Sequence, residues 1–223
     1  MVKQERAART REALIRAAAE IFAEEGFVTA SIATISRKAG VSAGGLHFHF
    51  GSKTELAEAV QGRAVEAVRR ITAAAPGRSG GALQLLIDGV HGLAALLAHD
   101  VVVRAGFGLC ADWRRDTGCD LRRIWQGWVQ DVFRAAERDE QLADGVSAED
   151  AALAVVAATV GFEVLGAGEP DWVSHRSLTR FWALLLPRLA AQHVLGGLVA
   201  AGSGREEVPG PQAADRPVQR LTD

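Results

Sequence analysis

The sequence predicts an all-α protein, and three observations support this prediction. Apolar residues recur at helical spacing through most of the chain, whereas no segment shows the sustained apolar and polar alternation of a half-buried strand. Serine stands immediately before several of these segments, where its hydroxyl can cap the first turn of a helix. Glycine and proline separate the segments, most clearly over residues 76–81. We therefore expect several short N-terminal helices followed by a larger helical bundle.

Four helices are predicted in the N-terminal part of the chain, over residues 10–25, 32–39, 43–50 and 53–73. Gly26 and Gly40 end the first two, because glycine readily adopts the conformation that terminates a helix. Ser31 and Ser42 precede the second and third helices as N-caps. The fourth helix begins at the run Ser-Lys-Thr-Glu over residues 52–55, which has the spacing of a capping box.

Five further helices are predicted, over residues 82–98, 100–112, 120–138, 148–166 and 173–200. Pro187 lies within the last pattern and should kink or split it, because proline has no N–H for the helix ladder. Residues 202–223 hold three of the six prolines and show no apolar periodicity. We interpret this last segment as a disordered tail.

Composition excludes several classes of protein. The 223 residues include 25 basic and 27 acidic side chains, so a chain that is basic throughout is excluded. Cys110 and Cys119 are too few for a disulfide scaffold and match no metal spacing, so we expect no metal and no cofactor. The charged N-terminus is unlike a signal peptide, and no apolar run reaches the ~18 residues of a membrane span. We expect a cytoplasmic protein with no membrane partner.

The charge is unevenly distributed along the chain. Residues 1–54 hold eight basic and five acidic side chains, a net charge of +3, whereas the rest hold 17 and 22, a net charge of −5. No acidic residue lies between Gly26 and Thr54, where Arg37, Lys38 and Lys53 are found. A segment of this kind can approach a phosphate backbone without electrostatic repulsion.

The same segment has the spacing of a helix-turn-helix. Its two short helices are joined by a three-residue turn that begins with glycine, and the second helix of such a motif can enter the DNA major groove. Leu46 and Phe50 lie four residues apart and should pack inward, which turns Ala43, Gly44 and His47 outward. The sequence therefore predicts double-stranded DNA as a partner.

Two features of this part of the chain leave alternatives open. Gly44 and Gly45 start a helix although each glycine costs it about 1 kcal/mol relative to alanine. The pair fits a close approach of the backbone to DNA, or it only softens the first turn. The basic residues before the first helix could reach an adjacent minor groove, or they could be solvated: Lys3, Arg6, Arg9 and Arg11.

A gapless stretch over residues 11–60 resembles the DNA-binding domain of the TetR family of bacterial repressors. It carries Phe-x-x-x-Gly-Phe at the end of the first helix, then Ile-Ala…Ala-Gly-Val-Ser, and then Leu-x-Phe-His-Phe-x-Ser-Lys-x-x-Leu. The resemblance implies an all-helical homodimer. A three-helix helix-turn-helix DNA-binding domain would occupy residues 1–52, and a helical bundle for ligand binding and dimerisation would occupy residues 53–201.

By position, the resemblance implies DNA contacts from Ser31, Ser42, Ala43, Gly44, His47, His49 and Lys53. The local charge adds Arg37 and Lys38 as DNA-binding candidates. Two positions depart from the family pattern, since Ala43 stands where lysine is usual and His47 where tyrosine is usual. Alanine cannot make a bidentate contact to guanine, although its methyl group can meet a thymine methyl. Imidazole can donate to a phosphate, with a shorter reach and with sensitivity to pH.

The C-terminal half is similar to the gamma-butyrolactone receptor branch of this family. The similarity is carried by VVRAGFGL over residues 102–109, by IWQGWVQDVFRAAERDEQL and by VAATVGFEVLGAG. Receptors of this branch sense small lactone or furan-type signals that control antibiotic production.

The resemblance to this branch implies that Trp125 stacks on the ligand. Further ligand-binding candidates are Trp128, Thr159 and Gln130. Taken without the resemblance, a tryptophan in a bundle more often belongs to the core than to a pocket, and Thr159 could equally bond a ligand oxygen or its own i−4 carbonyl. We expect the later residues Trp172 and Trp182 in the final helices and the dimer interface.

These observations predict a ligand-responsive repressor that binds a pseudo-palindromic operator as a homodimer and is released by a lactone- or furan-type signal. One alternative is a TetR-type repressor that answers to an antibiotic or xenobiotic and controls an efflux gene. A remote alternative is an all-α enzyme that pairs Cys110 or Cys119 with a histidine. No motif fixes such a pair in space, so we expect no enzyme.

Overall fold

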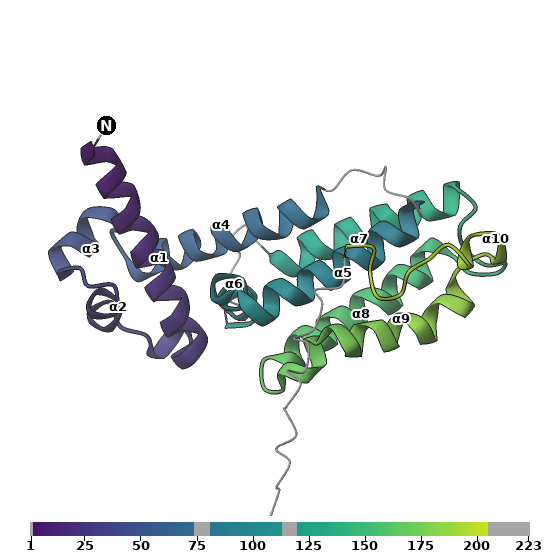
Figure 1. The fold of residues 1–223 in the computed structure, drawn as a ribbon. Coiled ribbons are helices and arrows are strands. Elements are labelled where there is room, and N and C mark those ends of the chain that lie inside the picture. The colour runs from purple at the N-terminus through teal and green to yellow at the C-terminus, as the bar shows by residue number, and fades with distance from the viewer. Residues whose placement is uncertain (1, 74–80, 113–119, 205–223) are drawn as a thin grey trace, which may run out of the picture.

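The structure, a computed structural model, describes residues 2–73, 81–112 and 120–204 and is built from helices (Figure 1). In chain order these are α1 (Val2–Thr29), α2 (Ile32–Lys38), α3 (Ala43–His49), α4 (Lys53–Thr72), α5 (Gly81–His99), α6 (Val101–Asp112), α7 (Leu121–Arg138), α8 (Ala148–Gly166), the 3₁₀ helix η1 (Pro170–Val173), α9 (His175–Leu189) and α10 (Gln192–Leu195). The described ranges contain no strand and a single isolated bridge, between Leu142 and Ala190. The predicted all-α fold is confirmed.

The first helix is longer than predicted. It begins at Val2 instead of residue 10, because the added residues are mostly alanine, arginine, glutamine and glutamate, which favour helix, and Glu5 suits the first turn. Gly26 does interrupt it, with φ of 77° and ψ of 163°, so only a short turn continues to Thr29. The basic residues from Arg6 onward therefore lie on a helix and not on an extended arm.

The C-terminal end is shorter in helix than predicted. In place of one helix over 173–200, the chain forms η1, α9 and α10. Pro187 lies in the last turn of α9, which ends two residues later at Leu189, so the helix is split as expected of a proline. Residues 205–223 of the predicted tail lie outside the described residues. The start of that segment is ordered, since the Ser203 N–H donates to Asp88 at 2.7 Å.

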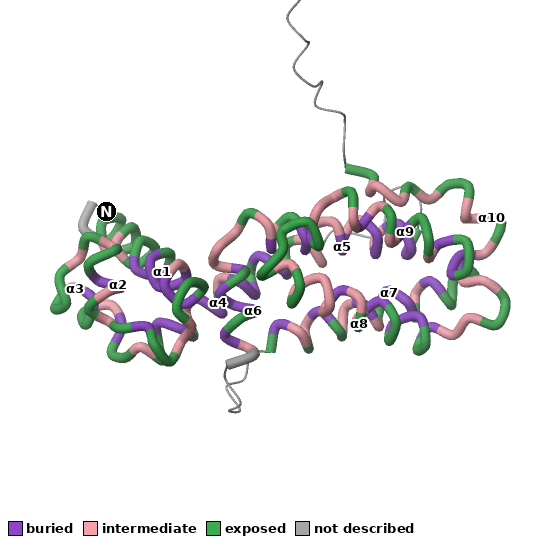
Figure 2. The backbone as a smooth tube through the Cα atoms, turned by 90° about the horizontal axis from the view of Figure 1, so that it is seen from below, coloured by how far each residue is buried: buried purple, intermediate pink, exposed green. Residues whose placement is uncertain are grey.

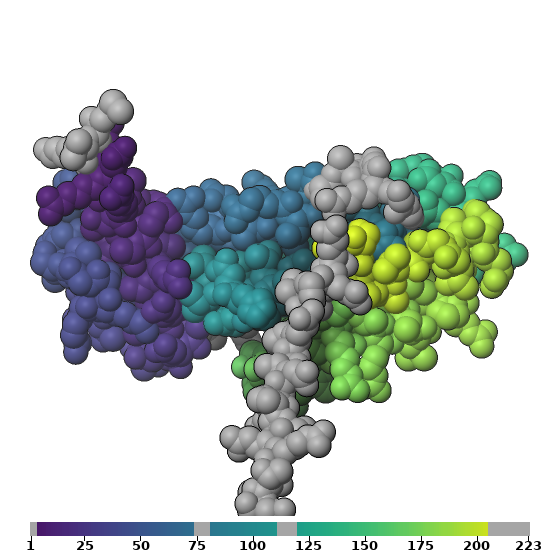
Figure 3. Space-filling view, viewed as in Figure 1, coloured from purple at the N-terminus to yellow at the C-terminus, as the bar shows by residue number. Residues whose placement is uncertain are grey.

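The apolar side chains form two buried clusters. Figure 2 marks the buried residues along the backbone of both parts of the molecule. The first joins α1, α2 and α3 with the beginning of α4, and we call this part of the molecule the head. The second joins the rest of α4 with α5, α7, α8 and α9, and we call it the bundle. Figure 3 shows the head at one end of an elongated molecule, with α4 and α6 between it and the remaining helices.

Helix α6 contributes to both clusters. Ala105 and Leu109 are buried in the head cluster, whereas Val103 and Phe107 are buried in the bundle cluster. The α6 backbone also lies close to α4, because a Cβ at Gly106 would meet the Ala64 side chain at 2.5 Å. A change in the bundle that moves α6 would therefore also move the head.

Helix α5 is long and apolar enough, by length and composition alone, to cross a membrane. This differs from the expectation that no apolar run reaches such a length. In the structure 56% of that apolar window is buried, and Leu86, Ile87 and Val90 lie within the bundle cluster. The apolar character of α5 is thus explained by its place in the bundle core.

Candidate DNA interface and ligand site

Serine caps hold the two short helices of the head in place. The Ser31 hydroxyl accepts from the Thr34 N–H, and the Ser42 hydroxyl accepts from the Gly45 N–H, each at 3.1 Å. Between the helices Gly40 adopts φ of +66°, a conformation that favours glycine. This geometry is that of the predicted helix-turn-helix, so the orientation of α3 is set by local hydrogen bonds.

Helix α3 presents the face that its sequence predicts. Leu46 and Phe50 are buried, whereas Ala43, Gly44 and His47 are exposed. The two glycines have different surroundings. A Cβ at Gly45 would meet the Val41 side chain at 2.8 Å, whereas a Cβ at Gly44 would meet nothing within 4 Å. Gly45 is therefore required by the packing of the turn, and only Gly44 leaves its outer side open to another surface.

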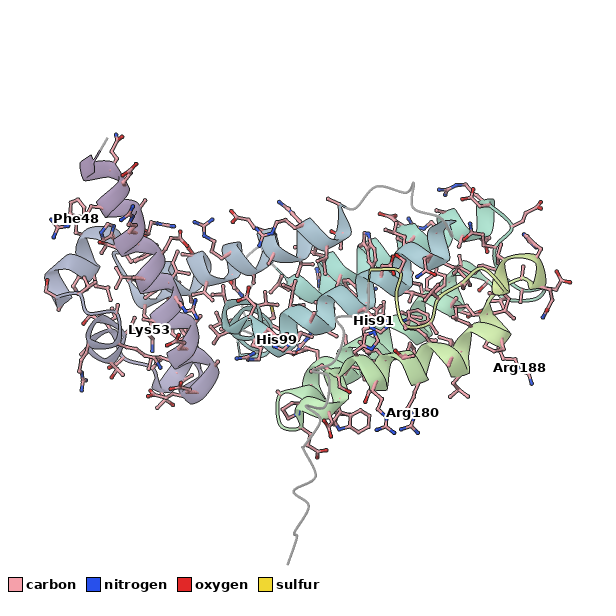
Figure 4. All side chains as sticks on the ribbon, in the orientation of Figure 1. Phe48, Lys53, His91, His99, Arg180 and Arg188 are labelled. Carbon is pink, nitrogen blue, oxygen red and sulfur yellow. The ribbon has the colours of Figure 1, made fainter. Side chains whose placement is uncertain are left out.

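Phe48 is an exposed apolar side chain on α3 that was not among the residues predicted from sequence. It is 82% exposed and lies at the outer end of the head (Figure 4). The His49 ring, half-buried, meets it edge-on with centroids 5.2 Å apart. The signal was present in the helical period, because Leu46 and Phe50 point inward and so turn Phe48 outward. Such a ring can make apolar contact with a thymine methyl.

The basic candidate residues fall into two groups. Arg37 is exposed, and no described ion pair includes it. Lys38 instead donates to carboxylates of α1, at 3.2 Å from both Glu20 and Glu24, and the hydrogen bond to Glu20 is the main cause that raises the pKa of Lys38. Folding thus brings acidic groups beside a segment that has none in its own sequence.

Lys53 is occupied within the head. Its ammonium group donates to the carbonyl oxygens of Phe27, Val28 and Ala30 at 2.8, 3.1 and 2.8 Å, and it lies 4.7 Å from the centroid of the Phe27 ring. An ammonium group has three N–H donors, so all three have partners in this conformation. Figure 4 shows Lys53 directed toward the end of α1. The predicted phosphate contact of Lys53 therefore competes with a structural role.

Arg11, one of the four N-terminal basic residues, also contacts the head, since its guanidinium lies 5.1 Å from the centroid of the Phe50 ring. This stacking against the last residue of the helix-turn-helix places Arg11 on the head surface. The side chain of Lys3 lies outside the described side chains.

The structure brings three of the four ligand candidates together in the bundle. The indole N–H of Trp125, a side chain only 1% exposed, donates to the Thr159 hydroxyl at 2.9 Å. The ring of Trp128 packs against that of Trp125, with centroids 4.9 Å apart, and its far edge lies against Gly89 of α5. Thr159 itself donates to the carbonyl of Val156 at 3.1 Å, one residue nearer than the i−4 carbonyl expected from sequence. A buried polar pair thus stands in an apolar core.

The remaining candidates are placed apart from this pair. Gln130 is half-buried, and no hydrogen bond links its side chain to another described residue. Trp172 is 39% exposed in η1, as fits a surface interface, but Trp182 is fully buried in the bundle core. The expectation that Trp182 lies in the dimer interface is therefore wrong, because its side chain faces the interior of its own chain.

The space around the Trp125–Thr159 pair is small. The cavity that Thr159 lines holds about 10 Å³, roughly one water molecule. It shares Ala94, Val173 and Leu178 with a much larger cavity of about 660 Å³. His91 and His175 line that larger cavity, with ring centroids 4.8 Å apart, and Figure 4 shows His91 beside the C-terminal segment. A few side chains therefore separate the buried pair from a ligand-sized space.

An apolar stripe is exposed on the outer side of α8 and α9. It is formed by Leu153 (70% exposed), Val164 (54%), Leu165 (46%) and Leu184 (81%). Arg180 and Arg188, one turn to either side of Leu184, point away from the bundle (Figure 4). A surface of this kind is unusual on a helix that faces only water, and it indicates an interface.

Metal and nucleophile chemistry find little support in the described part of the chain. No group of three or more His, Cys, Asp or Glu residues there could hold a metal ion. Cys110 is half-buried and its thiol donates to the Gly106 carbonyl at 3.3 Å, whereas Cys119 lies outside the described residues.

Comparison with known proteins agrees with this geometry. The family model described as "Bacterial regulatory proteins, tetR family" matches residues 14–60, which cover the helix-turn-helix. A TetR regulator from Streptomyces fradiae, TylP, is 30% identical, with 89% of this chain and 87% of that chain covered and a TM-score of 0.62. The chain thus belongs to the TetR family, and it is a DNA-binding transcriptional regulator.

Particular relatives carry the similarity further. The A-factor receptor protein of Streptomyces griseus is 28% identical over 208 residues, which cover 91% of this chain and 71% of that protein. A gamma-butyrolactone receptor described as ArpA-like has a TM-score of 0.76 at 25% identity, with 88% and 96% of the two chains covered. CprB of Streptomyces coelicolor, solved with its operator sequence, has a TM-score of 0.73 at 26% identity, with 86% and 93% covered.

Proposed function

We propose that this chain is a ligand-responsive repressor that a small signal of gamma-butyrolactone or furan type releases from its operator, in control of antibiotic production. The observation that carries the proposal is the buried Trp125–Thr159 pair within an apolar bundle. Small-molecule sites combine an apolar lining with a few convergent polar groups, and this pair offers an indole face and a hydroxyl. Similarity to an A-factor receptor and to gamma-butyrolactone receptors supports this ligand class.

The proposed DNA contacts come from the exposed side of the helix-turn-helix. Ala43, Gly44 and His47 face outward on α3 and would meet base edges in the major groove. Phe48 extends this surface with apolar area. Contacts with the phosphate backbone would come from Arg37, Ser31, Ser42 and His49, which are exposed or half-buried at the same surface.

The proposed dimer uses the apolar stripe of α8 and α9. A two-fold axis through this stripe would bring Leu184 and Leu153 out of water against the second copy, and burial in such an interface is a common reason for exposed apolar side chains. The two heads then lie on the same side of the dimer. Their α3 helices would enter successive major grooves of a pseudo-palindrome, about 34–36 Å apart.

Ligand binding at the Trp125–Thr159 pair requires the bundle to open. The cavity of about 10 Å³ at Thr159 is too small for a lactone, so the ligand has to displace side chains such as Val173 and Leu178, which separate it from the cavity of about 660 Å³. The opening would move α6 through Val103 and Phe107. Since Ala105 and Leu109 of the same helix are buried in the head, the head would turn and the two α3 helices would lose their spacing.

The experiment is release from the operator. The operator is located by footprinting the DNA upstream of the protein's own gene, and fluorescence anisotropy then follows binding at constant salt. A synthetic gamma-butyrolactone with an alkyl side chain is expected to release the wild type and to quench its tryptophan fluorescence. Release only by antibiotics, with no response to the lactone, would favour the efflux-type alternative and overturn the ligand class.

The proposal also assigns cellular context. A regulator that binds operator DNA acts in the cytoplasm, and it performs no catalysis.

The residue boundaries 1–52 for the DNA-binding domain and 53–201 for the ligand-binding domain belong to this proposal as well, with α6 as the element that both parts share.

A further inference from the structure

We propose a second effector site, for a small carboxylate with an apolar body, in a cavity between α1, α6 and α8. The cavity has a volume of about 330 Å³ and is lined from the head by Phe22, from α6 by Arg104 and Gly108, and from α8 by Glu163 and Ala167. This volume is at the lower end of the range for small-molecule sites, so a compact ligand fits and a multi-ring drug does not. Leu97 and Val173 line both this cavity and the small cavity at Thr159, but neither Trp125 nor Thr159 lines the cavity proposed here, and the site goes beyond the proposed function.

Two glycines of α6 have different surroundings. A Cβ at Gly106 would meet Ala64 at 2.5 Å, so this glycine is required by the close packing of α4. A Cβ at Gly108 would meet nothing within 4 Å. Glycine in a helix costs about 1 kcal/mol relative to alanine, and at Gly108 no internal contact offsets that cost. The missing side chain at Gly108 instead keeps the cavity open.

The charged side chains that line the cavity favour an anion. The Arg104 guanidinium is held at the end of α5, where it donates to the carbonyls of Leu97 and Ala98 at 3.1 and 3.0 Å, and no described ion pair includes it. Glu163 is only 11% exposed, and both of its oxygens accept from Arg122, at 3.0 and 3.1 Å. The acidic group is thus neutralised while the arginine has donors left, so the cavity favours an anion that accepts bidentate hydrogen bonds.

The cavity lies between the two parts of the molecule. Phe22 is buried in the head cluster, whereas Glu163 and Ala167 belong to the α8 end of the bundle. Two further α6 residues in the lining, Ala105 and Leu109, are themselves part of the head cluster. A ligand here touches both parts at once, so it would alter their relative position without a relay through the bundle core.

The same observation gives a role to the segment VVRAGFGL over residues 102–109. Four of its residues line this cavity, namely Arg104, Ala105, Gly108 and Leu109. None of them lines the small cavity at Thr159. These four residues are therefore placed at the junction with the head, whereas Val103 and Phe107 of the same segment are buried in the bundle cluster.

The test uses the full-length protein, its operator and sodium octanoate as the probe, with 1-octanol as the neutral analogue. Saturating octanoate is expected to change the operator dissociation constant at least fivefold, the lower end of typical allosteric coupling. By reciprocity, saturating operator changes the octanoate dissociation constant by the same factor. Octanol is expected to bind more weakly, because it cannot accept a bidentate hydrogen bond from Arg104.

Two variants locate the effect. Gly108→Leu fills the cavity and is expected to abolish octanoate binding, while Arg104→Gln is expected to weaken it at least tenfold. Gly127→Leu is the matched control, because Gly127 also lies in a helix, with nothing within 4 Å of its added Cβ, and lines none of the cavities described above. Octanoate binding that survives Gly108→Leu, or an operator affinity that octanoate leaves unchanged in the wild type, would overturn the proposal.

The lactone experiment distinguishes this site from the proposed function. Gly108→Leu is expected to keep its release by the lactone, and Trp125→Phe is expected to keep its response to octanoate. Failure of the lactone to release the wild type would count against the proposed ligand class alone. Failure of octanoate would count against the second site alone.

Discussion

The head and the bundle solve the same packing problem in different ways. In the head, serine hydroxyls at 31, 42 and 52 cap the helices through partners three residues away, as Ser147 and Ser174 do in the bundle, and the core is closed by apolar side chains that include Phe22 and Phe50. In the bundle, by contrast, the described residues include buried polar groups far from any helix end, such as Trp125 and Thr159. The indole N–H of Trp182 is buried with no hydrogen-bond partner among the described residues. Polar groups that are satisfied locally make the head rigid, whereas empty space and unsatisfied polar groups permit the bundle to change its shape.

One helix belongs to both parts, and it would transmit a change in the bundle to the head. Helix α6 is buried on one side in the head and on the other in the bundle. The head therefore lacks a complete core of its own without Ala105 and Leu109. Because the rigid head shares α6 with the bundle, any movement of α6 also moves the head. One chain can therefore combine a rigid DNA-binding part with a part that changes shape.

The largest expected effect tests whether one head is enough to read the operator. Leu184→Glu places a charge on the apolar stripe of α9 and should prevent dimerisation, because burial would remove the water around the carboxylate and pairing with Arg180 or Arg188 would not repay that cost. With one head per molecule, operator affinity is expected to fall at least 100-fold, measured by anisotropy beside sedimentation analysis. Val199→Glu is the control, since Val199 is 47% exposed but lies outside α8 and α9. A dimeric Leu184→Glu protein would refute the assignment of the interface.

The second effect compares two buried tryptophans of the bundle. Trp125→Phe and Trp182→Phe remove similar volume, and both side chains are at most 1% exposed. Only Trp125→Phe breaks a hydrogen bond, and it leaves Thr159 with an unmatched acceptor, so it should lose about 1–3 kcal/mol more in the free energy of unfolding. Urea unfolding measures the difference. Equal losses for the two variants would mean that the Trp125–Thr159 hydrogen bond contributes nothing.

The same pair of variants also tests the ligand site. Trp125→Phe is expected to bind the operator like the wild type and to lose its release by the lactone, while Trp182→Phe keeps both. If Trp125→Phe were released by the lactone as readily as the wild type, the pocket would have to lie elsewhere in the bundle.

The third effect asks whether a cation of the head supports the fold or binds DNA. Lys53→Ala removes three hydrogen bonds to the end of α1, so we expect a loss of roughly 2 kcal/mol in stability and a fall of about 4–8 °C in Tm. If the role of Lys53 is purely structural, the salt dependence of operator binding stays unchanged. Arg37→Ala is the counterpart, with Tm unchanged and the slope of log affinity against log salt reduced by about 1.

The opposite results would reverse the roles of Lys53 and Arg37. A reduced salt slope in Lys53→Ala with an unchanged Tm would show that its ammonium group leaves the carbonyls for a phosphate. An unchanged slope in Arg37→Ala would remove Arg37 from the proposed phosphate contacts.

More of the contacts in the head than of those in the bundle could be predicted from the sequence. The caps at Ser31 and Ser42 and the outward face of α3 depend on residues within four positions, so spacing alone predicts them. The partners of Lys38 and Lys53 lie 14 to 26 residues away in the chain, so their ion pairs and hydrogen bonds were not predictable. The acid-free segment was correct as sequence, yet folding places Glu20 and Glu24 beside it.

In the bundle, the positions of α5 to α8 were predictable, but the division of the last predicted helix into η1, α9 and α10 and the contacts between helices were not. The bounds of α8 followed from its apolar pattern and its serine cap. That Trp125 meets Thr159, that Glu163 pairs with Arg122, or that Trp182 faces the interior depends on how α7, α8 and α9 are rotated about their axes. Such rotations are set by the packing of many side chains at once and leave little local signal.

The smallest expected effect concerns the junction of the head and α4. Arg63 of α4 pairs with Glu12 of α1 and, at 2.7 Å, with Glu66. The hydrogen bond from Arg63 is the main cause that lowers the pKa of Glu66 below its ordinary value of 4.5. A carboxyl group whose pKa is lowered by folding stabilises the folded state above its unfolded pKa, and this contribution is lost as the pH falls through the lowered folded value.

Glu66→Gln should therefore be less stable than the wild type at pH 7, and the difference should shrink as the pH falls below 4.5. Because the pair is on the surface, the effect is small and weakens with added salt. Urea unfolding at pH 7, 5, 4 and 3 measures it, with Glu58→Gln as the control, since Glu58 is exposed on the same helix and no described ion pair includes it. A difference that stayed constant from pH 7 to pH 3 would show that the ion pair between Arg63 and Glu66, both on α4, does not contribute to the stability.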